Sequence, residues 1–126
     1  MSYSIDILEH IVYVTFTGDS DPLDLISLMS EPLFLPNVAK LQRLVFDFSQ
    51  TTDLNMSLDE VRQLSVVAKV EATFLSTLHI VIVLSGPNGR PRAEAYQQAL
   101  SRTTWRIDIV ETKAQTATLL AIATDR

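Results

Sequence analysis

Small polar side chains follow two hydrophobic segments of the chain and are candidates for binding chemistry. In open α/β sheets, ligands bind beyond the carboxyl ends of the strands, where such side chains would lie. Hydroxyl and amide groups there could hydrogen-bond a small ligand or contact a protein partner, although the same residue types commonly form turns. Asp47 lies within the segment LVFDF, and Ser49, Gln50 and Thr51 follow it directly. The other candidates, Ser85, Gly86 and Asn88, follow the segment HIVIVL.

Ser57 begins a four-residue pattern, SLDE, that has the spacing of a helix capping box. As an N-cap, the Ser57 hydroxyl would accept a hydrogen bond from a free backbone N–H, and Glu60 would reach back to the backbone of Ser57. A phosphate on this hydroxyl would also be stabilised by the free N–H groups and the helix dipole. We favour the capping role, because it is sufficient to explain the pattern.

Asp47 could alternatively be the phosphorylated carboxylate of a receiver-like domain. Receivers also need an acidic pair near the first strand and a lysine after the last one. The sequence offers only Lys113 for these roles, so we do not favour a receiver.

Two arginines, Arg90 and Arg92, lie beside the expected start of a helix. Backbone N–H groups at a helix N-terminus favour anions, and guanidinium groups could hold a phosphate headgroup or a carboxylate there. The alternative is a solvated surface pair, which is the commoner situation for arginine.

An apolar pocket is a further possibility, formed by Phe34 and by the hydrophobic stripe that contains Val66, Val70 and Phe74. These side chains could line or cover a binding site for a lipid-like ligand. A stripe of this kind more often belongs to an ordinary hydrophobic core.

The sequence contains few of the groups on which enzymes rely. His10 and His79 are the only histidines, so neither a metal cluster nor a Ser-His-Asp arrangement has obvious members. With three glycines in the chain, there is no GxGxxG, no P-loop and no nucleophile elbow. We therefore expect a protein without catalytic activity, metal or cofactor.

Composition narrows the classes of partner. The 126 residues suffice for one domain, residues 1–126, and 47% of them are hydrophobic. A net charge of −5 without a run of Lys or Arg argues against a nucleic-acid partner. The longest apolar runs are far short of the ~20 residues that span a bilayer, which argues against stable membrane insertion. Without cysteine or a recognisable secretory signal, we expect a soluble, cytoplasmic protein.

Hydrophobic periodicity predicts the strands that must position these residues. Apolar and polar residues alternate in segments 3–7, 12–16 and 105–109, as in half-buried strands. Segment 44–48 alternates as well, and its two phenylalanines share one face. Segment 79–84 is apolar almost throughout, which is typical of a central strand covered on both faces.

Helices are predicted between and after these strands. The first begins at Pro22 and breaks near Pro32, the second begins after Ser57, and the others span 91–103 and about 114–123. The resulting order is β-β-α-β-α-β-α-β-α. It predicts an α/β fold with a five-stranded mixed sheet, in which an N-terminal antiparallel hairpin is followed by parallel strands with right-handed crossovers.

Such crossovers place most helices on one face of the sheet if consecutive strands are neighbours. On the other face, Tyr13, Val45 and one side of the fourth strand would leave an apolar strip. An exposed strip of this kind usually finds a partner, so we expect a possible homodimer.

Four motifs together with this order of elements form a recognisable pattern. The motifs are Asp21-Pro22-x-Asp24-Leu25, Pro32-Leu33-Phe34-x-Pro36, Leu44-Val45-Phe46-Asp47-Phe48 and Ser57-x-Asp59-Glu60-Val61. The pattern covers almost the whole chain. It resembles the STAS domain of bacterial anti-sigma factor antagonists and, more closely, the SpoIIAA-like family, whose fold is also compared with the CRAL-TRIO lipid carriers.

In regulatory STAS proteins, an Asp-x-Ser at the end of a strand precedes an Asp-Ser-Ser-Gly at the helix start, whose first serine is phosphorylated by a partner kinase. Asp47-Phe48-Ser49 matches the first motif. An ungapped alignment sets Asn55, Met56, Ser57 and Leu58 against the second, which puts Met56 at the phosphoacceptor position. The resemblance therefore implies a regulatory module without a clear phosphoacceptor.

Two functions remain open. The first is a non-catalytic interaction module that docks a protein partner through the loop after the third strand and the following helix. The second is a small carrier or sensor of an apolar, lipid-like ligand.

Overall fold

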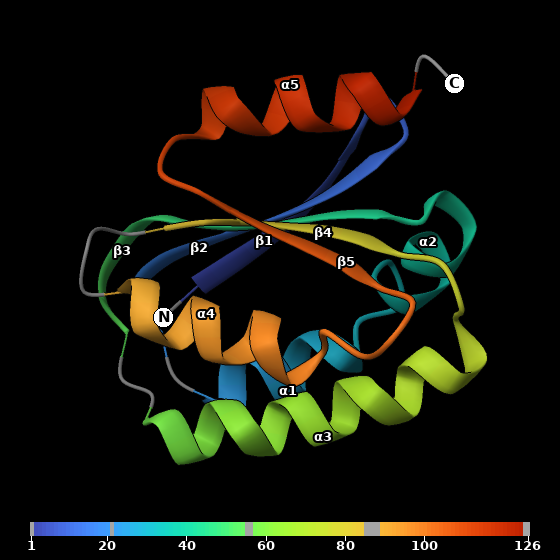
Figure 1. Ribbon diagram of the computed structural model, residues 1–126. Helices are drawn as coiled ribbons and strands as arrows, with labels where there is room; N and C mark the ends of the chain where they lie inside the picture. Colours follow the sequence, from blue (N-terminus) through green and yellow to red (C-terminus); the bar gives the residue numbers. More distant parts are fainter. Residues whose placement is uncertain (1, 21, 55–56, 85–88, 125–126) are drawn as a thin grey trace.

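A computed structural model describes residues 2–20, 22–54, 57–84 and 89–124. Its strands pair in the order β1-β2-β3-β4-β5, with β1 antiparallel to β2 and all other pairs parallel. The predicted α/β fold with an N-terminal hairpin and a five-stranded mixed sheet is therefore confirmed (Figure 1). The elements are β1 (Ser2–Leu8), β2 (Ile11–Ser20), α1 (Pro22–Met29), α2 (Leu35–Leu41), β3 (Arg43–Leu54), α3 (Leu58–Phe74), β4 (His79–Val83), α4 (Arg90–Ala99), β5 (Arg106–Val110) and α5 (Lys113–Thr124).

The segment LVFDF lies in β3, the middle strand of the sheet. Its side chains divide between the two faces, as the period of two requires. Leu44 belongs to a large hydrophobic cluster on one face, with Phe46 packed against it, whereas Val45 belongs to a smaller cluster on the other. Both faces of the sheet are thus organised around this strand.

The strand β3 continues well beyond Phe48, where the sequence predicted a polar loop. Thr15 of β2 is paired with Asp47, but Thr17 is paired with Gln50, so β3 contains one residue more than β2 over this interval. Such a bulge lets a strand absorb an extra residue without losing its pairing. The prediction of a loop at residues 49–51 was wrong, because β2 extends as far as Ser20 and offers its edge to these residues.

The helices α1, α2, α3 and α4 lie on one face of the sheet and α5 lies on the other (Figure 1). This distribution follows from the crossovers between neighbouring parallel strands, as expected. The last helix covers β3, β4 and β5. Its Leu120 is fully buried with Val45 and Val81, and Tyr13 packs against the same cluster. The apolar strip from which a homodimer was expected is therefore covered by the chain's own C-terminal helix.

The helix α2 was not predicted from the sequence, because Pro32 and Pro36 made its segment look like a connector. Pro36 occupies the first turn of α2, where its missing N–H costs no hydrogen bond. Val38 of this helix is buried, and so is Phe34, the residue that directly precedes the helix. This short helix packs near β2 on the face of the sheet that also carries α1, α3 and α4.

The helix α4 is shorter than the predicted span of residues 91–103. After Ala99, the hydroxyl of Ser101 donates a hydrogen bond to the Gln98 carbonyl, and that of Thr103 donates one to the Leu100 carbonyl. Short polar side chains compete in this way with the helical pattern and favour turns. The turn leaves Leu100 fully buried and leads directly to Trp105.

Candidate functional site

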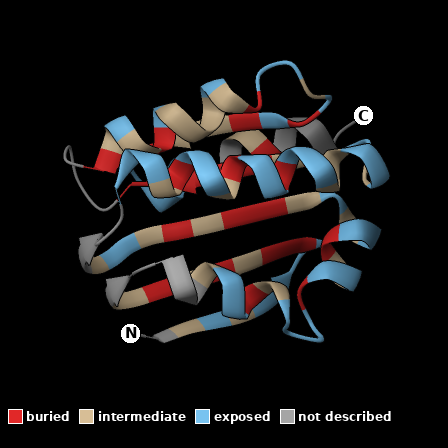
Figure 2. Ribbon diagram, turned by 90° about the horizontal axis from the view of Figure 1, so that it is seen from below, coloured by how far each residue is buried: buried red, intermediate tan, exposed pale blue. Residues whose placement is uncertain are grey.

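A cavity of about 450 Å³ lies between the sheet and the helices of the four-helix face. Its walls come from α1, α2, α3 and α4 on one side and from β3 and β4 on the other. Figure 2 looks onto this face, and strands of the sheet are visible between α3 and the pair α1 and α2. The volume falls within the range of about 300–1,000 Å³ that is usual for small-molecule sites.

The backbone of α3 lies nearer to α4 than to the sheet. The buried residues of α3 are Val61, Ser65 and Ala68, which are small and do not fill the space up to the strands. The Ser65 hydroxyl donates a hydrogen bond of 2.8 Å to the Val61 carbonyl of the same helix, so it needs no partner on the sheet. Because the side chains that α3 directs toward the sheet are small, they leave space between this helix and the strands β3 and β4.

On the strand side, Phe46 and Phe48 line the cavity together with Leu44, Ile80 and Ile82, and the two rings are held by contacts with other aromatic rings. Phe48 stacks on Phe16, with ring centroids 4.6 Å apart and planes 8° from parallel. Phe46 lies beside both, and Phe34 completes the row at 6.4 Å from Phe46. Such offset and tilted contacts stabilise aromatic clusters beyond the area they bury. We infer a preformed wall on the strand side of the cavity.

Trp105 closes one end of the cavity. Its indole N–H donates a hydrogen bond of 2.7 Å to the carbonyl of Leu75, the residue that ends α3. This bond ties the C-terminus of α3 to the start of β5. The end of α3 is therefore held in place while its middle stays away from the sheet.

Among the described residues that line the cavity, three carry ionisable side chains: Glu71 on α3, and Arg92 and Tyr96 on α4. Burial raises the pKa of Glu71. Burial also raises the pKa of Tyr96, strongly, and the nearby negative charge of Glu71 raises it further. The phenol is therefore a neutral hydrogen-bonding group at physiological pH.

The other face of the sheet contains a buried carboxylate. Asp47 is 0% exposed, and its Oδ1 accepts hydrogen bonds from the backbone N–H of Ser49 at 2.9 Å and from the Ser49 hydroxyl at 2.6 Å. Its Oδ2 lies 3.9 Å from Lys113 Nζ and, like the hydroxyl of buried Thr116, has no hydrogen-bond partner among the described residues. Lys113 lies over the ring of Tyr13, 5.5 Å from its centroid.

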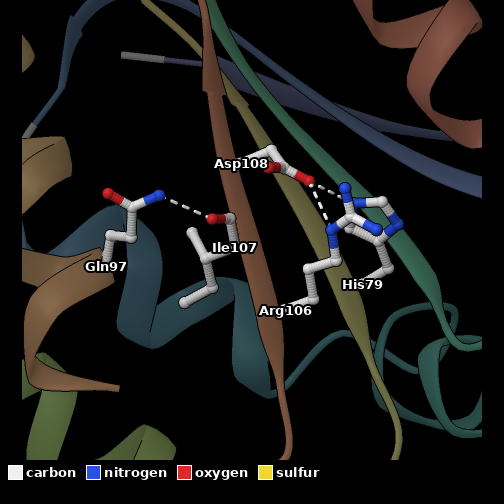
Figure 3. A network of polar contacts seen from close by, with 5 residues as sticks. All are labelled: His79, Gln97, Arg106, Ile107 and Asp108. Carbon is white, nitrogen blue, oxygen red and sulfur yellow. Dashed lines mark hydrogen bonds and ion pairs between the residues drawn. The ribbon is translucent and has the colours of Figure 1, made fainter. Parts of the chain in front are cut away.

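A second polar group joins β4 to β5 (Figure 3). His79 Nε2 lies 2.6 Å from Asp108 Oδ2, and Arg106 Nε donates to the same oxygen at 3.0 Å. On the other side of β5, Gln97 donates a hydrogen bond from its side-chain amide to the Ile107 carbonyl at 2.7 Å. These contacts tie the edge strand to its neighbours, so we assign them a structural role. The alternation of Arg106 and Asp108 with Ile107 and Ile109 was the sequence signal for the strand β5.

The residues that were predicted to share one loop site have different positions and different hydrogen-bond partners in the structure. Ser57 caps α3, with its hydroxyl accepting from the Glu60 N–H and Glu60 Oε1 accepting from the Ser57 N–H, which confirms the capping box. Ser49 binds Asp47, and the Thr51 hydroxyl donates to the Phe48 carbonyl within the extended β3. Gln50 is exposed on the same strand segment. The candidates Ser85, Gly86 and Asn88 lie outside the described residues.

The two arginines that were predicted to hold an anion also lie in different surroundings. Arg90 pairs with Glu111 at 3.2 Å, whereas Arg92 lines the cavity. Of the predicted apolar pocket, Phe34 lies in the cavity wall. The other three members, Val66, Val70 and Phe74, do not line it.

These three side chains point outward from α3, with exposures of 58% for Val66, 56% for Val70 and 87% for Phe74. The expectation that they line an apolar pocket or belong to the hydrophobic core was wrong, because the inward face of α3 is narrow and runs through Val61 and Ala68.

Sequence reasoning missed Glu71 and Tyr96 as site residues. A signal for Glu71 was present, because Leu64, Ala68, Glu71 and Leu75 follow the spacing of one helix face, on which a carboxylate is out of place. Tyr96 follows Arg92 by four residues and so lies on the same side of α4.

Comparison with protein-family models, with curated proteins and with solved structures found no significant match. Of the pattern described from the sequence, the structure shows the five-stranded mixed α/β sheet. In the part of the chain that the structure describes, no three His, Asp or Glu side chains are grouped to hold a metal ion. No helix there has the length and apolar character needed to cross a membrane.

Proposed function

We propose that this chain is a non-catalytic carrier or sensor that holds one elongated, largely apolar ligand in the cavity between α3 and the sheet. The observation that carries the proposal is the cavity itself: about 450 Å³, and among the described residues that line it all but Glu71, Arg92 and Tyr96 are non-ionisable and nearly all are apolar. Interiors without a ligand role are normally packed with few voids larger than a water molecule. The space is not a sealed void, because its lining reaches the surface at Ile26 and Val67, and a partly open apolar space of this size is typical of a small-molecule site.

The architecture offers a way in for such a ligand. Ile26 on α1 and Val67 on α3 both line the cavity and are 55% and 51% exposed, so the lining continues to the surface between these helices. The aromatic wall is fixed by ring contacts, whereas α3 is attached chiefly to α4. A small outward movement of α3 would widen this opening without disturbing the sheet.

The test uses a plug and a matched control on the same helix. Ala68→Trp places a large ring in the cavity wall, and Val66→Trp places the same ring on the exposed side of α3. Isothermal titration calorimetry with dodecan-1-ol should show one site in the wild-type protein and in Val66→Trp. Ala68→Trp should lose at least tenfold in affinity while staying folded by circular dichroism. Absence of binding to the wild-type protein, or equal binding by both variants, would contradict the proposal.

A second candidate function is favoured by the outer face of α3. Val66, Val70 and Phe74 form an exposed apolar stripe at helical spacing, and exposed patches of this kind often mark protein-interaction sites. The resemblance to STAS domains implies docking through this helix and the loop before it. We therefore propose, as the alternative, a SpoIIAA-like interaction module without a phosphorylation switch.

Site-specific photo-crosslinking in cells tests this alternative. Phe74→p-benzoylphenylalanine should give a discrete adduct of defined mass, whereas the same substitution at Lys69, exposed elsewhere on α3, should not. Equal, diffuse labelling from both positions would argue against a docking surface at the stripe.

A further inference from the structure

The two edges of the sheet differ in how their backbone groups are satisfied. At one edge, β5 lies beside α4, and Gln97 donates its side-chain amide to the outward carbonyl of Ile107 at 2.7 Å. At the other edge, β1 pairs with β2 alone. Within the described part of the chain, Ile5 and Ile7 have no hydrogen-bond partner on the outer side of β1. An open strand edge of this kind is a template for pairing with another strand.

The turn between β1 and β2 determines which backbone groups of β1 point outward. Both residues of the turn 9–10 have positive φ, 53° and 66°, as in the type I′ turn of a two-residue hairpin. The flanking pair, Leu8 and Ile11, is then hydrogen-bonded, and bonded pairs alternate with non-bonded pairs along the two strands. The N–H and C=O groups of Ile5 and Ile7 therefore point away from β2.

The strand β1 lacks the features that usually prevent pairing at a sheet edge. Its segment SYSIDIL contains neither proline nor lysine, and its register with β2 runs without a bulge. Its side chains on the four-helix face are apolar and incompletely covered: Tyr3 and Ile5 pack against the large hydrophobic cluster but are only partly buried, and Ile7 is 42% exposed. A further strand beside β1 would remove more of this apolar surface from water.

A second copy of β1 complements this edge. Antiparallel pairing centred on Ile5 sets Ile5 against its own copy and Tyr3 against Ile7 of the other copy, so apolar side chains meet on one face. On the opposite face, Ser4 meets Asp6 of the other copy, and a hydroxyl can donate a hydrogen bond to a carboxylate. Pairing centred on Asp6 would instead set two carboxylates against each other, which is destabilising. Charge therefore favours the register centred on Ile5.

We propose that β1 is a self-association surface, through which two copies of this chain form a dimer with one continuous sheet and with Ile5 at the twofold axis. The same strand is used by both copies, so the assembly closes at two. The opposite edge is engaged by Gln97 and does not extend it. A junction of two strands is small beside the usual interface of about 1,200–2,000 Å², so we expect a dissociation constant on the order of micromolar. The dimer does not depend on the proposed carrier function.

Sedimentation velocity over a concentration series, from micromolar to sub-millimolar protein, tests the surface. The wild-type chain should show a reversible monomer–dimer equilibrium. Ile5→Pro removes the outward N–H at the centre of the junction without removing a bond to β2, and proline is tolerated at such edge positions. It should weaken the dimer at least tenfold while staying folded by circular dichroism.

Ile7→Lys places a charge in the apolar row and should also weaken the dimer, which provides the measurement if Ile5→Pro fails to fold. Gln98→Lys adds the same charge at an exposed position of α4 and is the matched control. It should dimerise as the wild type does.

A charge pair at position 4 tests the register. Ser4→Lys sets a positive side chain against Asp6 of the other copy, twice in each dimer, and should tighten the dimer several-fold. Ser4→Asp sets two carboxylates together at the same places and should weaken it by a similar factor.

Three results would overturn the proposal. The first is a monomer at every concentration, and the second is a dimer that neither Ile5→Pro nor Ile7→Lys weakens. The third is an equal response to Ser4→Lys and Ser4→Asp, which would exclude the register centred on Ile5. Growth beyond two copies would also contradict an assembly that closes through β1 alone.

Discussion

The two faces of the same sheet are filled in different ways. On one face, α5 lies directly on β3, β4 and β5, and Leu120 is fully buried among Val45, Val81 and Val83. On the other face, α3 leaves a cavity of about 450 Å³ above an aromatic wall. The difference shows that the position of a covering helix depends on the size of the side chains it turns inward.

Hydrophobic content alone does not predict which face is closed. The helix α3 carries bulky residues, but it exposes Val66, Val70 and Phe74 and buries Ser65 and Ala68. The closed face, in contrast, tolerates a buried carboxylate and a buried hydroxyl, Asp47 and Thr116. Predictions that compare the two faces therefore test this account.

The largest difference is expected between matched leucine truncations. Leu120→Ala on the closed face should lower the free energy of unfolding by about 2–5 kcal/mol, because the surrounding side chains cannot collapse fully into the space. Leu64→Ala, in the cavity wall, should cost only about 1 kcal/mol, because Leu64 is partly exposed and already lacks neighbours on one side. Urea denaturation of both variants measures the difference, and equal losses would contradict it.

The next largest effect is expected for Asp47→Ala. The substitution removes the acceptor of two hydrogen bonds from Ser49, and such bonds to a charged group are worth about 1.5–3 kcal/mol each. Part of this loss is offset because a buried carboxylate no longer has to be desolvated, so we expect a net loss of about 1–3 kcal/mol. Ser49→Ala, which removes one of the two donors, should cost less. An Asp47→Ala variant as stable as the wild type would show that the carboxylate is not part of the closed face's stability.

A gain of about 1 kcal/mol is expected for Thr116→Val. The Thr116 hydroxyl is buried without a hydrogen-bond partner in the described structure, and valine has nearly the same shape without the unsatisfied group. Thermal unfolding should show the gain. A loss of stability would mean that the hydroxyl is hydrogen-bonded in solution, for example to water.

The smallest effect is expected for Glu71→Gln on the cavity face. Because burial raises the pKa of Glu71 above its ordinary value of 4.5, the folded protein is penalised once the pH is high enough to ionise this carboxyl group. Glutamine removes the penalty, so the variant should be more stable at pH 7 by roughly half a kcal/mol or less, since solvent screens a half-exposed group. The gain should vanish below about pH 4, where both states of the wild type carry a proton on Glu71. A gain that persists at pH 3 would point to a cause other than this ionisation.

The sequence was sufficient to predict the order of elements apart from α2, and the cap at Ser57, because each depends on local periodicity or on a short motif. It was not sufficient for the course of residues 49–51, because their pairing depends on the length of β2, a partner distant in sequence. The covering of Val45 by Leu120 depends in the same way on a contact across 75 positions.

The site was less accessible to prediction than the fold. Phe34 and Arg92 were among the predicted candidates and line the cavity. The helix α3, however, contains apolar residues on both sides, and periodicity did not decide which side faces the sheet. Glu71 shares one side of α3 with Leu64 and Ala68. That placement could have indicated which side of the helix faces the sheet. The cavity itself arises from the distance between α3 and the sheet, which no local pattern encodes.

The most direct test of the central claim is a methyl-resolved NMR measurement of intermolecular NOEs between the isotope-labelled protein and unlabelled dodecanoate. Methyl groups of the cavity, such as those of Leu28, Val38 and Ile80, should show NOEs to the alkyl chain, and those of Val45, Val81 and Leu120 on the closed face should show none. NOEs to the closed face, or none to the cavity methyls under saturating dodecanoate, would contradict the account.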